Sequence, residues 1–251
     1  MKQIKLIKKR NFIICAIIAF AILASIIVIA IINNQTNKQN IKVDGENMQN
    51  ARNYTGDISS KTVIGFIGDS ITYGDPFPNN SAVSVMIKQL GDNYLYINDG
   101  VNGQTSETYK NEFLQFALRD FERYNVKTVC IMLGTNDSRV EIAESSKQYK
   151  ANIEYIIKSL KDIGVKKIIL NEPPHFEIIP NSWDESSRGR IKEYVKELNL
   201  LADKKEVFIG DTLAWSVFKE NPSLLWDDLH PNVEGYKVLG GLWADALKKL
   251  S

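Results

Sequence analysis

Short apolar runs alternate with amphipathic segments from residue 61 to the end of this chain. Fully apolar strands separated by helices are typical of a parallel sheet that is covered on both faces. We therefore expect an α/β protein, a doubly wound three-layer α/β/α sandwich with a five-stranded parallel sheet of the flavodoxin-like type. The pattern predicts strands at residues 63–67, 94–98, 127–133, 167–170 and 207–209, and helices at residues 82–90, 107–124, 145–162, 186–203 and 233–250.

The helix predictions rest on apolar side chains that recur every three or four residues. In the segment 107–124 this spacing places Phe113, Phe116, Ala117 and Phe121 on one face. We expect that face to pack against the sheet. The other long helices should each bury one face in the same way.

The start of the chain differs from the rest. Residues 12–32 form an apolar run of about 21 residues, long enough for a helix to cross a hydrocarbon core of ~30 Å. Five basic residues precede this run, so the positive-inside rule predicts a cytoplasmic N-terminus and an extracytoplasmic remainder. The length of the run favours one uncleaved transmembrane helix. The alternative is a signal peptide with a cleavage site at Val28-Ile29-Ala30, which would make the remainder a secreted protein.

A polar segment connects this apolar run to the alternating pattern. Residues 35–60 are rich in Asn, Gln, Lys and Asp, a composition typical of a flexible linker. The predicted organisation is a basic segment with a transmembrane signal anchor at 1–34, a linker at 35–60 and a globular domain at 61–251. The expected localisation is a single pass through the cell membrane with the globular domain outside.

Charge and cysteine content exclude some classes of partner. Residues 1–42 hold seven of the 31 Lys and Arg residues and no acid, so the remainder carries 24 basic against 30 acidic residues. An acidic domain of this kind argues against nucleic acid as a partner, because phosphate binding needs clustered cations. Cys15 in the apolar run and Cys130 in a predicted strand should not form a disulfide. The sequence has no Cys/His cluster at the spacing of metal ligands.

The residues that can do chemistry follow the predicted strands. In doubly wound sheets, functional sites lie at the carboxyl ends of the strands. We therefore expect four loops to meet at one edge of the sheet. Those loops contain Gly68-Asp69-Ser70, then Gly103, then Gly134-Thr135-Asn136-Asp137, and finally Asp227, Asp228 and His230.

This set of side chains suits acyl transfer with a serine nucleophile. The hydroxyl of Ser70 needs a neighbouring base to take its proton, and the chain has only two histidines, His175 and His230. Asp227 stands three residues before His230, and within a turn that spacing can bring its carboxylate to the second ring nitrogen. Asp228 is the alternative orienting acid.

The oxyanion of a tetrahedral intermediate needs hydrogen-bond donors. We expect the backbone N–H groups of Ser70 and Gly103 and the side-chain amide of Asn136 to supply them. Two neighbouring carboxylates are interpreted as structural rather than catalytic. Asp69 should hold the turn before the serine, and Asp137 should cap the segment that follows it.

At these positions the chain resembles the SGNH (GDSL-type) hydrolase family. Its four signature blocks occur in order over essentially residues 62–250, with Ile71 where the first block usually has leucine. The resemblance implies that the protein needs neither a metal nor an organic cofactor. It also implies the site residues: the nucleophile Ser70, the base His230, the orienting acid Asp227, and an oxyanion hole built by Ser70, Gly103 and Asn136.

We interpret the chain as a membrane-tethered serine esterase. The family includes lipases, lysophospholipases, thioesterases and carbohydrate O-acetylesterases, so the expected substrate is an acylated carbohydrate or an acylated lipid. An O-acyltransferase that passes the acyl group to a cell-envelope glycan is the alternative, because the same triad would serve it. A non-catalytic binding domain is a third hypothesis, and the intact Ser, His and Asp argue against it.

Five further side chains near these loops are open to two interpretations. His175 follows a Pro-Pro turn, where it either lines the cleft or is an ordinary loop residue. Trp183 and Trp226 either stack on a sugar or shape an acyl pocket, or they pack in the core or at its rim. Tyr73 and Asp75 lie just past Ser70 and are candidates for the wall of the cleft.

Overall fold

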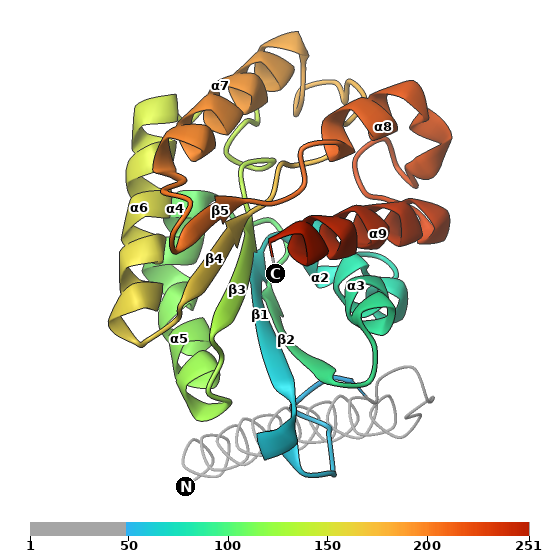
Figure 1. The fold of residues 1–251 in the computed structure, drawn as a ribbon. Coiled ribbons are helices and arrows are strands. Elements are labelled where there is room, and N and C mark those ends of the chain that lie inside the picture. The colour runs from blue at the N-terminus through green and yellow to red at the C-terminus, as the bar shows by residue number, and fades with distance from the viewer. Residues whose placement is uncertain (1–48, 251) are drawn as a thin grey trace, which may run out of the picture. The chain divides into compact units, whose positions relative to one another are not determined.

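The computed structural model describes residues 49–250 and contains a sheet of five parallel strands in the order β2-β1-β3-β4-β5 (Figure 1). β1 is an interior strand between β2 and β3, where Ile67 pairs with Asp99 on one side and Ile131 on the other. The predicted α/β architecture is confirmed in this part of the chain. The strands are β1 (Thr62–Gly68), β2 (Tyr94–Gly100), β3 (Thr128–Met132), β4 (Lys167–Leu170) and β5 (Val207–Ile209).

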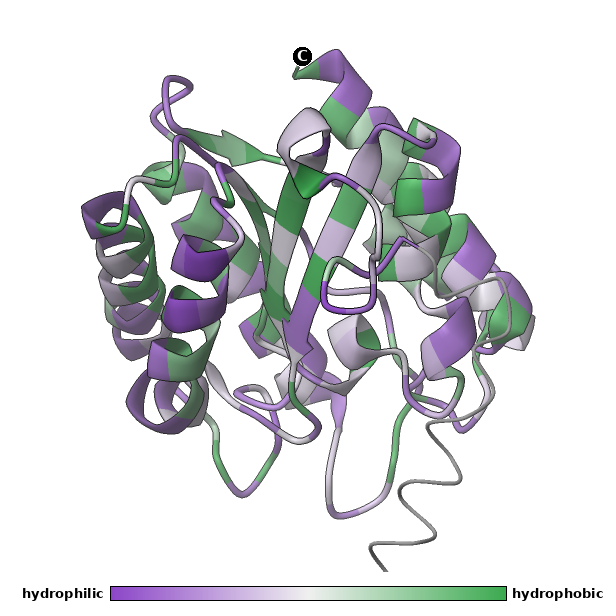
Figure 2. Ribbon diagram, turned by 90° about the horizontal axis from the view of Figure 1, so that it is seen from below, coloured by the Kyte–Doolittle hydropathy of each residue, from purple (hydrophilic) through white to green (hydrophobic). Residues whose placement is uncertain are grey.

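Helices cover both faces of the sheet (Figure 1). Alternate strand residues point to opposite faces, so Val63 and Ile67 join one hydrophobic cluster while Ile64 and Phe66 join the other. Figure 2 shows hydrophobic positions along the strands and hydrophobic and hydrophilic stripes on the surrounding helices. One face carries α3 (Ala82–Leu90), α8 (Ala214–Glu220) and α9 (Val233–Lys249), and the other carries α5 (Leu114–Arg123), α6 (Ser146–Asp162) and α7 (Glu185–Leu201).

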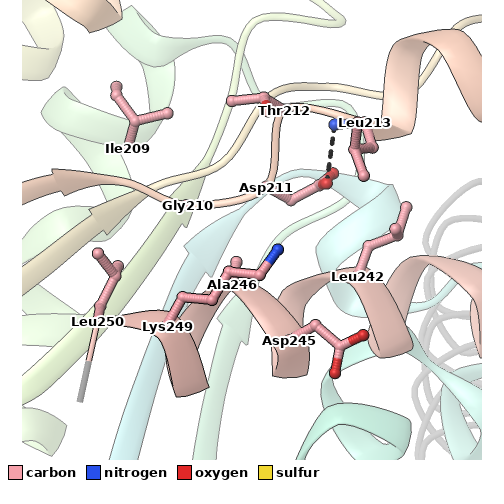
Figure 3. A pocket seen from close by; sticks show the side chains of 10 residues that line it. All are labelled: Ile209, Gly210, Asp211, Thr212, Leu213, Leu242, Asp245, Ala246, Lys249 and Leu250. Carbon is pink, nitrogen blue, oxygen red and sulfur yellow. Dashed lines mark hydrogen bonds between the residues drawn. The ribbon is translucent and has the colours of Figure 1, made fainter.

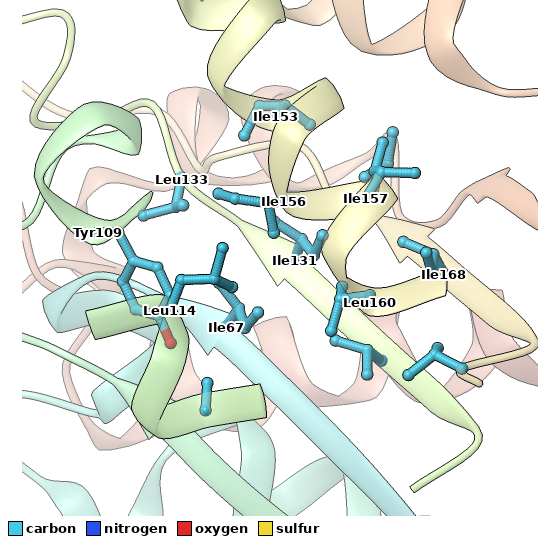
Figure 4. Close-up of a cluster of buried hydrophobic side chains, with 14 of the residues drawn as sticks. Ile67, Tyr109, Leu114, Ile131, Leu133, Ile153, Ile156, Ile157, Leu160 and Ile168 are labelled. Carbon is cyan, nitrogen blue, oxygen red and sulfur yellow. The ribbon is translucent and has the colours of Figure 1, made fainter. Parts of the chain in front are cut away.

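The larger cluster lies between the sheet and α6. Figure 4 shows Ile131 and Ile168 of the sheet close to Ile156, Ile157 and Leu160 of that helix. All five are buried. Burial of a side chain of this size contributes about 1.5–3 kcal/mol, so this layer holds the strands in place and with them the loops at their ends.

Side-chain caps fix where the long helices begin. The Ser145 hydroxyl accepts a hydrogen bond from the Gln148 N–H and starts α6. The Asn232 side chain accepts one from the Gly235 N–H and starts α9, two residues after His230. Such caps typically stabilise a helix by about 1 kcal/mol, and this one also sets the position of the histidine loop.

The predicted helix at 107–124 is interrupted. It consists of α4 (Ser106–Thr108), a π-helical turn η3 (Tyr109–Phe113) and then α5. A π turn uses i→i+5 hydrogen bonds and rotates the residues that follow it relative to a regular helix. The expectation that Phe116 faces the sheet is therefore wrong: its side chain is 59% exposed, and the Arg119 guanidinium lies over its ring.

Residues 49–60 contact the sheet, although the sequence assigned them to a flexible linker. The Ala51 N–H donates to the Tyr96 carbonyl oxygen at 2.9 Å, alongside the outer edge of β2. The Arg52 guanidinium donates to the carboxylates of Asp99 and Asp120 and to the Asn98 carbonyl oxygen. This part of the segment covers the edge of β2 and joins it to α5.

The predicted transmembrane anchor at 1–34 lies outside the described residues, as does the first part of the linker. Between residues 49 and 250, no helix is long and apolar enough to cross a membrane. Cys130 is a free, buried thiol in β3, and burial raises its pKa to about 12. Cys15 also lies outside the described residues.

Candidate functional site

Ser70 lies where the first strand turns into a short helix. β1 ends just before Asp69, and the Asp69 side chain accepts a hydrogen bond from the Ile71 N–H at 3.0 Å. This cap starts α2 (Ser70–Tyr73), in which Ser70 is the first residue. The serine is therefore fixed at the carboxyl end of the interior strand β1, and Asp69 holds the turn as predicted.

Close packing explains the glycine before this turn. A Cβ at Gly68 would lie 2.0 Å from the Thr72 Oγ1 and 2.6 Å from the Met132 carbonyl oxygen. A larger residue would push α2 away from β3. Gly68 thus allows the helix that carries Ser70 to lie directly against the sheet.

A tight turn that begins at Asp227 holds His230. The Asp227 carboxylate accepts hydrogen bonds from the Leu229 N–H at 3.3 Å and the His230 N–H at 2.7 Å. Asp228 has a φ of 65°, a left-handed conformation that aspartate tolerates better than most residues. The Trp226 N–H donates to the His230 carbonyl oxygen at 2.7 Å and closes the turn.

His230 bridges Ser70 and Asp227. Its Nε2 lies 2.9 Å from the Ser70 Oγ, and its Nδ1 lies 2.8 Å and 3.1 Å from the two Asp227 carboxylate oxygens. With a proton on Nδ1 donated to Asp227, Nε2 can accept the proton of the Ser70 hydroxyl. Asp228, the alternative acid, forms no hydrogen bond with this ring in the described structure.

Asp227 is ionised at neutral pH. Burial on its own would raise the pKa of this carboxyl, but the hydrogen bonds from the His230 backbone and ring outweigh burial and hold the pKa below its usual range. A carboxylate beside Nδ1 favours the protonated ring that forms when His230 takes a proton. The arrangement can therefore move a proton from Ser70 onto the histidine.

The expected oxyanion donors come from three loops at this edge. Gly103 has a φ of 75°, and a Cβ there would meet nothing within 4 Å, so its backbone conformation rather than space favours glycine. Within residues 49–250 its N–H has no acceptor. The Ser70 N–H, at the start of α2, has no partner in its own helix. The Asn136 amide donates one hydrogen bond to the Gln104 carbonyl oxygen at 3.1 Å, and its second N–H is free within these residues.

Asp137 joins two of these loops. The sequence predicted that it would cap the segment following it, and that expectation is wrong. Its carboxylate accepts hydrogen bonds from the Ser106 N–H at 2.9 Å and the Ser106 hydroxyl at 2.5 Å, and so caps a helix 31 residues earlier. Burial raises the pKa of Asp137 to about 6, against the effect of these bonds. Asn136 and Asp137 together hold the loop that carries Gly103.

A second buried carboxyl, Asp69, directly precedes the serine. It is 1% exposed, and its Oδ2 has no hydrogen-bond partner among the described residues. Burial raises the pKa of Asp69 to about 7, although the Ile71 N–H and nearby His230 act in the opposite direction. This carboxyl is thus partly protonated near neutral pH, next to the proposed nucleophile.

His175 and the two tryptophans singled out in the sequence have different environments. His175 is buried, its ring packs edge-on against Trp215 with 4.9 Å between centroids, and burial lowers its pKa. Trp183 is 8% exposed, and its indole N–H donates to the Thr135 carbonyl oxygen at 3.0 Å. Trp183 therefore supports the Asn136 loop from inside the protein, whereas Trp226 is exposed at the surface.

Tyr73 and Asp75, which the sequence placed in the wall of the cleft, have different contacts. Tyr73 is exposed and, with Arg52 and Asn98, lines a cavity of about 230 Å³. The Asp75 carbonyl oxygen accepts a hydrogen bond from the Tyr236 hydroxyl at 2.7 Å, which ties the loop after α2 to α9. Both residues lie on the segment that leaves Ser70.

Another cavity, of about 340 Å³, lies between the loop after β5 and α9 (Figure 3). Its charged lining residues are Asp211, Asp245 and Lys249. The Asp211 carboxylate accepts hydrogen bonds from the Leu213 and Ala214 N–H groups and so starts α8. This aspartate serves as a helix cap, and the lining contains no residue of the four loops around Ser70.

Residues 66–238 match the GDSL-like lipase/acylhydrolase family. An acetylxylan esterase from Xylanibacter ruminicola is 25% identical over 212 residues, which cover 74% of this chain and 43% of that protein. This chain therefore spans less than half the length of that relative.

Solved structures of esterases share the fold. Est24, a carbohydrate acetylesterase from Sinorhizobium meliloti, aligns with a TM-score of 0.58 and 18% identity, covering 76% of this chain and 100% of that one. An aryl esterase from M. smegmatis aligns with a TM-score of 0.60 and 17% identity over 76% and 100% of the two chains. A lipase/acylhydrolase from Enterococcus faecalis aligns with a TM-score of 0.57 and 22% identity, covering 75% of this chain and 96% of that one.

Proposed function

Because this chain belongs to the GDSL-like lipase/acylhydrolase family, we propose that this GDSL-type ester hydrolase works through a triad of Ser70, His230 and Asp227. The observation that carries the proposal is the line of hydrogen bonds from the Ser70 Oγ through both ring nitrogens of His230 to Asp227. A nucleophile, a base and a group that orients the base are the parts that serine acyl transfer needs.

The reaction has two halves. In the first, the Ser70 Oγ forms a bond to the ester carbonyl carbon while its proton passes to His230 Nε2. The tetrahedral intermediate then breaks the bond to the alcohol oxygen, which leaves with the proton from His230. In the second half, His230 takes a proton from water, the resulting hydroxide attacks the acyl-enzyme, and the Ser70 Oγ leaves with that proton as the acid is released.

The negative oxygen of each tetrahedral intermediate is the charge to be stabilised. We assign this role to the N–H groups of Ser70 and Gly103 and the side-chain amide of Asn136. All three donors are held before substrate arrives, so they need no rearrangement when the charge develops. Loss of one such donor typically costs about 10²–10³ in rate.

We further propose that the substrate is an O-acetyl ester of a carbohydrate. The similarity to an acetylxylan esterase and the shared fold of a carbohydrate acetylesterase support this choice over a long-chain lipid ester. The proposal that the domain is exported and tethered by residues 12–32 rests on the sequence pattern alone.

The experiment is an acyl-donor panel with the full-length chain and its Ser70→Ala variant. Acetyl and palmitoyl esters of glycerol and of xylo-oligosaccharides would be compared for acid release. We expect acetyl sugars to be the best substrates and Ser70→Ala to lose at least about 10³-fold in kcat. A preference for palmitoyl glycerol would contradict the carbohydrate assignment. Little acid release with transfer to an added sugar acceptor would instead indicate an acyltransferase.

A further inference from the structure

Trp226 is an unusually exposed aromatic side chain at the edge of the sheet that carries Ser70. It is 62% exposed, and it directly precedes Asp227. The four tryptophans of the chain all lie among the described residues, and Trp226 is the exposed one. Trp183 and Trp243 are buried, and Trp215 is partly buried against His175. Exposure of an indole ring leaves a large apolar area in water, and nothing in the packing of the core requires it here.

The backbone under this indole is fixed. The Trp226 N–H donates to the His230 carbonyl oxygen, and the adjacent Leu225 forms a bridge with Pro231. The Asn232 side chain adds hydrogen bonds to the Leu225 and Ser223 carbonyl oxygens. The exposed ring is thus attached to a rigid turn rather than to a mobile loop.

The ring itself is held by Phe77. The two ring centroids lie 5.3 Å apart with an interplanar angle of 88°, an edge-to-face contact that fixes orientation. Phe77 is partly buried against the smaller hydrophobic cluster and lies seven residues after Ser70. The aromatic pair therefore joins the loop of the nucleophile to the loop of the histidine.

The chemistry of the reaction places the alcohol part of the ester next to His230, whose turn also carries Trp226. His230 hands its proton to the departing alcohol oxygen, so that oxygen must lie next to His230. A sugar ring attached to it has C–H faces that suit a flat aromatic surface and hydroxyls that suit carboxylates. The exposed carboxylate of Asp228 lies two residues from Trp226 in the same turn. A long acyl chain would instead favour continuous apolar surface.

We propose that Trp226, braced by Phe77, is the platform on which the sugar ring of the ester stacks, and that it determines specificity for carbohydrate esters. This inference rests on the proposed esterase function, and it assigns the leaving-group side of the same site. Trp226 supplies rigid contact area at a low cost in side-chain entropy.

The first test compares two substrates in the full-length chain. We expect Trp226→Ala to lower kcat/KM for acetylated xylo-oligosaccharide by about tenfold more than it lowers kcat/KM for 4-nitrophenyl acetate, which has no sugar. Trp226→Phe should restore part of this difference. Phe116→Ala removes an aromatic side chain of similar exposure from α5 and should change neither value. Equal effects on both substrates in Trp226→Ala would overturn the proposal.

The second test measures binding without turnover. In a Ser70→Ala chain, Trp226 should account for most of the fluorescence that iodide can quench, because the other tryptophans are buried or partly buried. Acetylated xylo-oligosaccharide should protect this fluorescence, and unchanged quenching at saturating sugar would contradict the stacking. If the wild-type chain releases acid from neither substrate, the proposed function fails. If the wild-type chain hydrolyses both substrates and Trp226→Ala leaves the ratio of their kcat/KM values unchanged, the proposed function stands and only the role of Trp226 as a sugar platform is wrong.

Discussion

The Nε2 of His230 lies 2.9 Å from the Oγ of Ser70, although 160 residues separate them in the chain. The sheet produces this proximity, because Ser70 follows the interior strand β1 and His230 lies two residues before the cap of the helix α9, which packs beside that strand. Two hydrogen-bonded turns then set the orientation of each side chain. The fold therefore assembles the proposed catalytic pair without any large movement.

The hydrogen bonds between Asp137 and Ser106 predict a positioning role for Asp137. Asp137→Asn keeps the shape of the side chain but replaces one carboxylate oxygen, which accepts a hydrogen bond, with an NH2 group. The loop that carries Gly103 is therefore held less firmly. We expect kcat for a small acetyl ester to fall by about 10-fold or more while KM changes little. Steady-state kinetics with circular dichroism would measure the effect and check the fold.

Ser138→Ala is the matched control for that variant. It removes a buried hydrogen bond in the same turn, from the Ser138 hydroxyl to the Thr135 carbonyl oxygen, without touching the Gly103 loop. Its stability should fall by about 1 kcal/mol and its kcat should change much less. Equal losses of kcat in both variants would show that Asp137 acts only through stability.

Asp69 predicts a pH dependence of stability. Its pKa is about 7 in the folded protein, above the usual value of about 3.9 for an unfolded chain. A raised folded pKa contributes stability that is fully present below pH ~4 and is lost as the pH rises through about 7. The free energy of unfolding of the wild type, minus that of Asp69→Asn, should therefore decrease between pH 4.5 and 8.

Urea unfolding at several pH values would measure this difference. Subtraction removes the contributions of other groups whose pKa is raised, such as Glu172, where burial and Asp211 raise the pKa to about 7. A difference that stays constant or grows with pH would mean that Asp69 is ionised in the folded protein.

Arg52 predicts that the folded domain begins well before Thr62. Arg52→Ala leaves Asp99 and Asp120 facing each other without their shared cation. We expect a loss on the order of 1–2 kcal/mol in the free energy of unfolding, because these pairs are partly exposed. Arg52→Lys should recover only part of the lost free energy of unfolding, since lysine cannot form the same fork of hydrogen bonds.

Thermal unfolding of the full-length variants would test this. Lys158→Ala is the control, because Lys158 makes an exposed ion pair with Asp162 on α6 and does not contact residues 49–60. A Tm for Arg52→Ala no lower than that of Lys158→Ala would indicate that residues 49–60 contribute little to the fold.

The sequence predicted the sheet well because each strand is a short apolar run, and it predicted where polar loops would meet. It predicted the wrong side for Phe116 because a π turn leaves no mark in the apolar periodicity. It missed the segment around Arg52 because that contact uses backbone and charge rather than apolar side chains.

Contacts between residues far apart in the chain were the other feature that the sequence could not predict. Asp137 is a helix cap, as its residue type suggests, but its helix lies 31 residues earlier, and only the folded chain reveals the pairing. Trp183 and Trp226 had the same two interpretations in the sequence. The fold buries the first under the Asn136 loop and leaves the second exposed beside Asp227. Burial of this kind depends on tertiary packing, which residue type alone does not determine.

The measurement that tests the triad most directly is labelling of the full-length chain with a fluorophosphonate, followed by mass spectrometry of the peptides. The wild type should gain one phosphonyl group, located on Ser70. His230→Ala should slow labelling by at least about 10³-fold, because the hydroxyl then lacks its base. Labelling at another residue, or labelling of His230→Ala at the wild-type rate, would contradict the assignment of Ser70 and His230 as nucleophile and base.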